Sequence, residues 1–244
     1  GFSNLISLKT IISRSSQDQM LFPRRGSNFS FGLQLTPPYS LFGNKDYSAL
    51  SFNEKYKFIE FHKWTFKSAW YTSIIGNLVL ATKAEYGYLG HYNNDIGPSP
   101  FEKFEVGGNP MYATNYIFGS DIDSLRGYPD AQLTPQTVVQ DNGQARRFYD
   151  GNVYDKYTVE LRYPVSLNPS ATIYGLAFIE GGNAWSSISE FKPFHIKRSA
   201  GVGVRVFLPM FGLLGIDWGY GFDPLAGQTK PNGGEFHFVL GQQF

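Results

Sequence analysis

The sequence predicts an all-β protein, and three observations lead to that prediction. Apolar and polar residues alternate along many segments, which is the period of a strand and not of a helix. Charged residues make up 17% of the 244 residues, below the roughly 25% usual in soluble domains, while aromatic residues also reach 17%. Short turns alternate with long polar loops along the chain. Together these features favour a transmembrane antiparallel β-barrel.

The C-terminal third of the chain alternates most clearly. In "LLGIDWGYGFD", which begins at Leu213, large apolar residues fall on one face and glycine or aspartate on the other. The segments "SAGVGVRVFL" from Ser199 and "EFHFVLGQQF" from Glu235 repeat this period of two. Each segment therefore predicts a strand with one apolar face and one small or polar face.

The same alternation recurs upstream, so we expect about nine strands in all. The alternating segments lie at residues 28–35, 63–70, 78–88 and 158–163 and around Phe178, with a weaker case in "LISLKTIIS" from Leu5. Several have the roughly 9–11 residues that a tilted strand needs to cross a bilayer. Longer loops are expected at residues 37–55, about 90–153, 186–195 and 223–233, with short turns between them.

The shared period predicts which side chains face the lipid and which face the lumen. The residues expected to face lipid are Phe29, Leu80, Leu161, Val204, Trp218 and Phe238. Those expected to face the lumen are Lys83, Glu160, Arg205 and Asp217. Aromatic residues near strand ends, expected as interfacial girdles, are Tyr71, Tyr88, Tyr163, Trp185, Phe222 and Phe244. A soluble β-sandwich is the alternative, but glycine-rich polar faces suit a crowded barrel interior better.

Composition and motif content argue against several classes of function. The net charge of +1 offers no field for nucleic acid, so no nucleic-acid partner is expected. The chain has no cysteine, and its four histidines are scattered without metal-ligand spacing. We therefore expect no metal, no cofactor and no catalytic residues, hence no enzyme. An outer-membrane protease or phospholipase is the rival enzyme class, and a passive porin is a further alternative.

One arginine in the longest loop, "DIDSLRGYPD", needs an explanation. Arg126 stands between Leu125 and Gly127, and Tyr128 follows. Loops of this length are functional or disordered, and the aromatic and glycine content of this one favours a packed segment. In a barrel the loop would pack inside the lumen, where a partly desolvated arginine needs a carboxylate partner. The alternative is a solvated loop arginine.

Inward-facing carboxylates are few, so the candidate partners can be named. Glu180 in "AFIEGGNAW" is favoured because a period of two places Phe178, Glu180 and Gly182 on one face. Three other acidic residues remain rivals for the same role: Glu85, Glu160 and Asp217.

These segments resemble the BamA family of outer-membrane-protein assembly factors. The matching motifs are "GSDIDSLRGYPD" in the long loop, "FIEGG" in the second strand after it, and the terminal "FHFVLGQQF". The segment as a whole resembles Bacteroidetes members of the family. The family is built from periplasmic POTRA domains and a sixteen-stranded barrel. Its sixth extracellular loop folds into the lumen and places a (Val/Ile)-Arg-Gly-(Phe/Tyr) motif against a Phe-x-Asp-x-Gly motif. Here Leu125 replaces Val or Ile, and Glu180 replaces the aspartate.

The resemblance implies that residues 1–244 are the C-terminal part of such a barrel, from about the eighth strand to the sixteenth, with the long loop at about 90–153 inside. The first barrel strands and POTRA domains are then expected before residue 1. Implied partners are unfolded outer-membrane proteins as clients, accessory outer-membrane lipoproteins and the lipid bilayer, and the implied location is the bacterial outer membrane.

The resemblance also implies that the protein inserts its clients through a weakly paired seam between the first and last strands. The seam strand and C-terminal signal fall on Phe236, Phe238, Leu240, Gly241 and Phe244. Glycine within a strand weakens pairing, which would suit a seam. The alternatives within the superfamily are a TamA-like factor, a two-partner secretion pore and a patatin-linked barrel.

Overall fold

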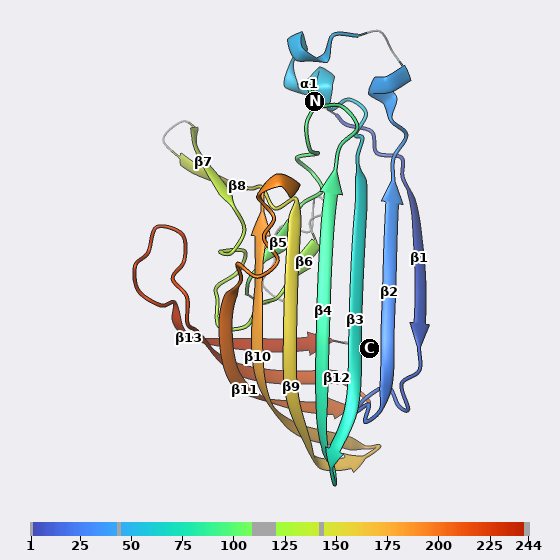
Figure 1. The fold of residues 1–244 in the computed structure, drawn as a ribbon, viewed down its shortest axis with the longest axis vertical. Coiled ribbons are helices and arrows are strands. Elements are labelled where there is room, and N and C mark those ends of the chain that lie inside the picture. The colour runs from blue at the N-terminus through green and yellow to red at the C-terminus, as the bar shows by residue number, and fades with distance from the viewer. Residues whose placement is uncertain (1, 43–44, 109–120, 142–143, 242–244) are drawn as a thin grey trace.

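A computed structural model describes residues 2–42, 45–108, 121–141 and 144–241 of the chain. Its main feature is one nine-stranded antiparallel sheet (Figure 1). The strands, in sheet order, are β1 (Leu8–Ser15), β2 (Gly26–Leu35), β3 (His62–Ile75), β4 (Leu78–Gly90), β9 (Val153–Asn168), β10 (Ala171–Trp185), β11 (Lys197–Leu208), β12 (Gly212–Gly221) and β13 (Gly233–Gly241). The all-β prediction is confirmed.

The order of the strands in the sheet follows the chain, and each expected segment contains a strand. The two central strands are longer than the alternation suggested, with 16 residues in β9 and 15 in β10. In the part of the chain that the structure describes, helix is limited to α1 (Phe52–Lys55) and the 3-10 turns Tyr39–Phe42, Tyr47–Ala49 and Ile188–Glu190. Within the described residues, no helix has the length and apolar character to cross a membrane.

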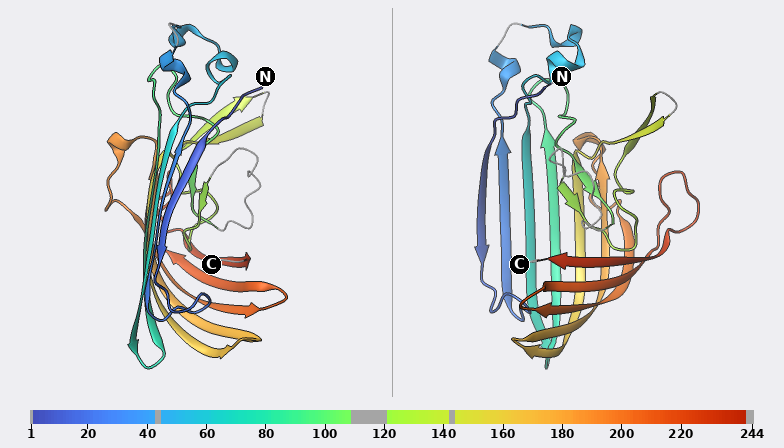
Figure 2. Two further views of the ribbon diagram at one scale, coloured as in Figure 1. Left: turned by 90° about the vertical axis from the view of Figure 1, so that its right-hand side faces the viewer. Right: turned by 180° about the vertical axis from the view of Figure 1, so that it is seen from behind.

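The sheet bends strongly between its two edges, which are β1 and β13. Figure 2 shows an almost flat wall at β1–β4, after which β9–β13 turn around a concave interior. The long loops lie at one end of the strands, and the short turns and the connection at residues 16–25 lie at the other (Figure 1). This is the layout of part of a barrel wall, and among the described strands it stays open between β1 and β13.

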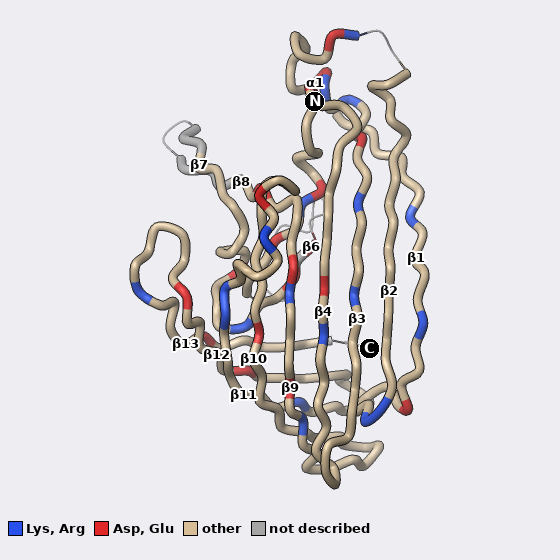
Figure 3. The backbone as a smooth tube through the Cα atoms, viewed as in Figure 1, with Lys and Arg blue, Asp and Glu red and all other residues tan. Residues whose placement is uncertain are grey.

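The two faces of the sheet follow the predicted alternation. Leu161, Val204, Trp218 and Phe238 are exposed on the convex face, whereas Glu160, Arg205 and Asp217 are buried on the concave face. Lysine and arginine gather with aspartate and glutamate along the middle of β3, β4, β9 and β10 (Figure 3).

Two of the expected girdle residues are not on the free outer surface. Tyr71 was a wrong prediction, because its ring lies on the concave side, packed against the buried cluster around Tyr174. Trp185 is buried because the ring of Phe191, in the next connection, packs edge-on at 4.9 Å. Phe244 lies outside the described residues.

The connection between β4 and β9 holds the long loop. It contains β5 (Phe104–Val106) and β6 (Asp121–Asp123), which pair in parallel, and the hairpin of β7 (Gln136–Asp141) and β8 (Gln144–Tyr149). The β5–β6 pair lies on the concave side of the sheet (Figure 2). Its Phe104 packs with Tyr128 of the loop and Tyr154 of β9 in the larger buried core.

Candidate functional site

The loop motif lies inside the curved sheet, not in solvent. Leu125 and Tyr128 have no exposed surface, and Arg126 is 7% exposed. The alternative of a solvated loop arginine is therefore excluded. Leu125 packs against Gly182 of β10, where an added Cβ would lie 2.8 Å from its Cδ1. The absence of a side chain at Gly182 is what lets the loop approach the wall so closely.

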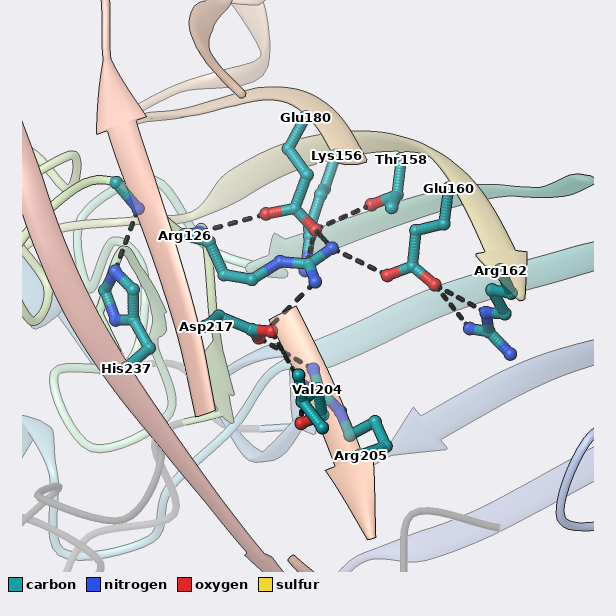
Figure 4. Close-up of polar contacts among 11 residues, drawn as sticks. Arg126, Lys156, Thr158, Glu160, Arg162, Glu180, Val204, Arg205, Asp217 and His237 are labelled. Atoms are coloured by element: carbon teal, nitrogen blue, oxygen red, sulfur yellow. Dashed lines mark hydrogen bonds and ion pairs between the residues drawn. The ribbon is translucent and has the colours of Figure 1, made fainter. Parts of the chain in front are cut away.

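The guanidinium of Arg126 contacts three carboxylates from three strands (Figure 4). Nη2 lies 2.6 Å from Glu180 Oε1 and 2.7 Å from Glu160 Oε1. Nη1 lies 3.4 Å from Asp217 Oδ2. The planar group also stacks on Phe178, with its central carbon 3.6 Å from the ring centroid. We call Arg126, Phe178, Glu160, Glu180 and Asp217 the loop lock.

Glu180 is the main partner of Arg126 because it also binds the loop backbone. Its Oε2 accepts from the Arg126 N–H at 2.9 Å, and its Oε1 also accepts from the Thr158 hydroxyl at 3.1 Å. One carboxylate therefore holds both the side chain and the main chain of the loop. Of the rivals, Glu160 and Asp217 also reach Arg126, whereas Glu85 pairs with Lys67 at 3.1 Å.

The other carboxylates of the lock are shared with strand arginines. Arg162 donates to Glu160 Oε2 from Nε at 2.8 Å, and Arg205 donates to both oxygens of Asp217 at 2.7 Å. Charges buried in this way are stable only when paired and hydrogen-bonded. Because every carboxylate of the lock meets at least one arginine, the network meets that condition.

Gly127 turns the loop backbone against β12. Its φ of +85° is a conformation that side chains rarely adopt. An added Cβ at Gly219 would lie 2.8 Å from the Gly127 nitrogen, and one at Gly221 would lie 2.5 Å from the Gly127 oxygen. Gly127 N–H donates to His237 Nε2 at 2.8 Å, and its carbonyl accepts from Asn232 at 2.8 Å. The loop backbone thus packs directly against the glycines on the inward face of β12.

A second set of contacts holds the loop nearer the strand ends. The Tyr128 hydroxyl donates to the Arg198 carbonyl at 2.7 Å and accepts from the Asp223 N–H at 3.2 Å. The Arg198 guanidinium donates to both carboxylate oxygens of Asp223, at 2.9 and 3.1 Å. Burial raises the pKa of Tyr128 to about 12. We call Tyr128, Arg198 and Asp223 the rim clasp.

The last strand carries the residues expected at the seam. Phe236, Phe238 and Leu240 are exposed on the convex face. Gly241 pairs with Leu213 of β12 and is the last described residue of the strand. Among the described strands β13 pairs with β12 alone.

Sequence reasoning brought together the correct motifs but missed several contacts. His237 and Asn232 were not predicted to bind the loop backbone, although they hold Gly127 on both sides. For His237 a signal existed, because a period of two puts it on the inward face between Phe236 and Phe238. For Asn232, in a loop, no periodic signal exists.

The contacts of Arg126 and Gly127 with three strands position the long loop against the inner face of the sheet. A model of the Omp85 superfamily domain matches residues 1–244. A solved structure of BamA from Haemophilus ducreyi lacking POTRA domains 1–3 is similar, with a TM-score of 0.63 and 15% sequence identity. The match covers 96% of this chain and 41% of that one, so the chain spans less than half of that structure. No curated protein matches the sequence.

Proposed function

Because the chain belongs to the Omp85 superfamily, a family of outer-membrane barrels that insert or translocate proteins, we propose that it is part of a BamA-type assembly factor. In this role it folds and inserts β-barrel clients into the outer membrane without covalent chemistry. The observation that carries the proposal is the loop lock, in which Arg126 meets Glu180 while stacked on Phe178.

The packed lumen favours this function over a passive porin. A porin needs an open, water-filled channel past its charged residues. Here the loop rests directly on the wall, with Gly127 held by His237 and Asn232. Such a loop occupies the interior and supports one stable shape of the barrel, which suits an insertion machine better than a pore.

The edge of β13 away from β12, which forms the proposed seam with the first strand of the complete barrel, is the proposed site of client contact. Unpaired N–H and C=O groups along an edge can template an incoming strand by β-augmentation. Gly233, Gly234 and Gly241 contribute no side chain to packing, which suits a strand that must part from its partner at the seam. The proposed partners are unfolded outer-membrane proteins, accessory lipoproteins of an assembly complex, and the bilayer.

A crosslink tests the seam. Two cysteines, one near Gly241 and one on the first strand of the complete barrel, should form a disulfide that stops client insertion while the barrel stays folded. Heat-modifiable gel mobility reports folding, and the appearance of a reporter barrel in the outer membrane reports insertion. The matched control places the same pair across β11 and β12, at Val202 and Trp218, which are paired in the sheet. Normal insertion with the seam fully crosslinked rules out the gate and favours a translocation pore of the same superfamily.

A further inference from the structure

Residues 16–25, which connect β1 to β2, do not form a tight turn. They fold back along the concave side at the end of the sheet opposite the long loops (Figure 2). Asp18 organises the segment, because its Oδ1 accepts from the Arg24 N–H at 2.9 Å. The Arg24 guanidinium then donates to the Gly76 carbonyl at 3.1 Å, and Ser73 donates to the Arg24 carbonyl at 3.2 Å. The connection is therefore tied to the neighbouring β3–β4 hairpin.

Phe22 is the anchor of this connection in the interior. Its side chain is 1% exposed and packs in a buried cluster with Val79 of β4 and with Tyr174, Leu176 and Phe178 of β10. The Phe22 and Tyr174 rings lie 5.2 Å apart. In sheet order, β3, β4 and β9 lie between β2 and β10. The segment therefore crosses the inside of the wall and is not a local hairpin.

A charged chamber of about 500 Å³ separates this connection from the long loop. Asp123, Ser124 and Arg126 of the long loop line one side, and Gln17, Leu21 and Pro23 of the connection line another. The strands supply the remaining wall, including Lys83 and Glu160. The chamber thus has the long loop as its roof and residues 16–25 as its floor.

The floor and the roof are joined by one chain of contacts. Tyr174, which packs on Phe22, lies 5.9 Å from the Arg162 guanidinium, and Tyr71 lies 5.4 Å from it. Arg162 donates to Glu160, which in turn accepts from Arg126. This chain leads from Phe22 to Glu160 in three contacts, and Phe178, which is also part of the loop lock, lies in the same buried cluster as Phe22.

We propose that residues 16–25 are a second closure of the lumen, which seals the periplasmic end while the long loop seals the other. We call this segment the lumen floor. The proposal rests on the outer-membrane placement of the family but goes beyond client insertion, because it assigns the segment a sealing function. Two closures in series would keep the barrel impermeable to ions while the long loop moves.

Conductance in planar bilayers tests the floor, with the complete protein and its Phe22→Ala, Arg126→Gln and doubly substituted forms. Arg126→Gln alone should conduct little, because the floor still blocks the path. Adding Phe22→Ala should raise the conductance several-fold over Arg126→Gln alone. If the double variant conducts no more than Arg126→Gln, the floor does not seal the barrel. Gln19→Ala is the matched control, since Gln19 lies on the same connection, is exposed and does not line the chamber, and it should add nothing.

A tethered form keeps the test valid if Phe22→Ala weakens folding. Residues 1–244 contain no cysteine. The substitutions Phe22→Cys and Val79→Cys therefore introduce one defined pair of cysteines into this part of the protein. In the Arg126→Gln background the disulfide should hold the floor shut, and reduction should raise the conductance several-fold. Heat-modifiable mobility must be unchanged by reduction. An unchanged conductance on reduction overturns the proposal. Client insertion is measured in parallel. A loss of insertion while the conductance behaves as expected would contradict the proposed function and leave the lumen floor standing.

Discussion

The loop lock and the rim clasp hold the same loop with the same chemistry in different surroundings. In each, an arginine meets a carboxylate through two or more short hydrogen bonds. The side chains of Arg126 and Glu180 are 9% and 2% exposed, whereas that of Arg198 is 64% exposed. An exposed pair contributes about 0–1 kcal/mol, whereas breaking a buried pair costs about 3–5 kcal/mol because it strands a charge. Hydrogen-bond geometry alone therefore does not predict which of the two sites contributes more to stability; burial does.

The comparison also shows why the lock needs several partners. An arginine in contact with water keeps its hydration, so Asp223 alone can satisfy Arg198. Arg126 has lost most of its hydration, and Glu180, Glu160, Asp217 and the Phe178 face replace it from different strands. The lock thereby links β9, β10 and β12 through the loop. The clasp links the loop only to the ends of two neighbouring strands, β11 and β12.

The largest effect should come from Arg126→Glu, which places a fourth carboxylate in the lock. We expect a loss of about 3–5 kcal/mol in the free energy of unfolding, because the substitution breaks a buried ion pair. The long loop should become sensitive to protease. Glu180→Arg should act similarly, and combining the two should recover part of the loss. If the loop of Arg126→Glu stays as protected as wild type, the lock does not hold it; if the pair shows no coupling, Glu160 or Asp217 is the main partner.

A smaller effect is expected from Gly219→Ala, on the inward face of β12 where the loop backbone packs. The added Cβ would meet the Gly127 nitrogen at 2.8 Å, so the loop must shift, at about 1–3 kcal/mol for overpacking. Gly175→Ala is the matched control, because its nearest neighbour would be 4.0 Å away. Chemical unfolding in detergent measures both. Equal stability of the two variants would mean that the loop does not rest on β12.

The clasp variants should have weaker effects than the lock variants. Tyr128→Phe removes a hydroxyl that joins the Arg198 carbonyl to the Asp223 N–H, at about 0.5–1.5 kcal/mol. Arg198→Ala removes an ion pair that water screens, so its effect on stability should be smaller still. Limited proteolysis of the loop gives the comparison with Arg126→Glu. A loss for Arg198→Ala as large as that for Arg126→Glu would contradict the ranking by burial.

Acid should produce the smallest effect. Hydrogen bonds from Arg198 hold the pKa of Asp223 below its ordinary value. A carboxylate whose folded pKa is lowered contributes stability above its unfolded pKa and loses it as pH falls through the folded value. The contribution of the clasp to stability should therefore be constant near neutral pH and should fall only below about pH 4. Comparing loop proteolysis by an acid-stable protease in wild type and Asp223→Asn isolates this contribution; identical acid profiles would show that Asp223 does not titrate in the clasp.

The sequence by itself determined the strands, their faces and the two motifs that meet. Alternation is a local property, because successive side chains of a strand point to opposite faces wherever the strand lies. It therefore placed Glu160, Arg205 and Asp217 inward and Val204 and Trp218 outward without any knowledge of the fold. Buried charge needs a partner, and this requirement led from Arg126 to a short set of inward carboxylates.

Only the tertiary structure decided which of those carboxylates Arg126 meets. Glu85 and Glu160 look alike in sequence, yet one pairs with Lys67 and the other with Arg126. Contacts of this kind depend on strand register and on the curvature of the sheet, which sum small rotations over many strands. The same holds for Asn232 at Gly127 and for Phe22 beside Tyr174, where residues of irregular connections meet distant strands. Such segments have no period, so their place is set by where the bent wall leaves space.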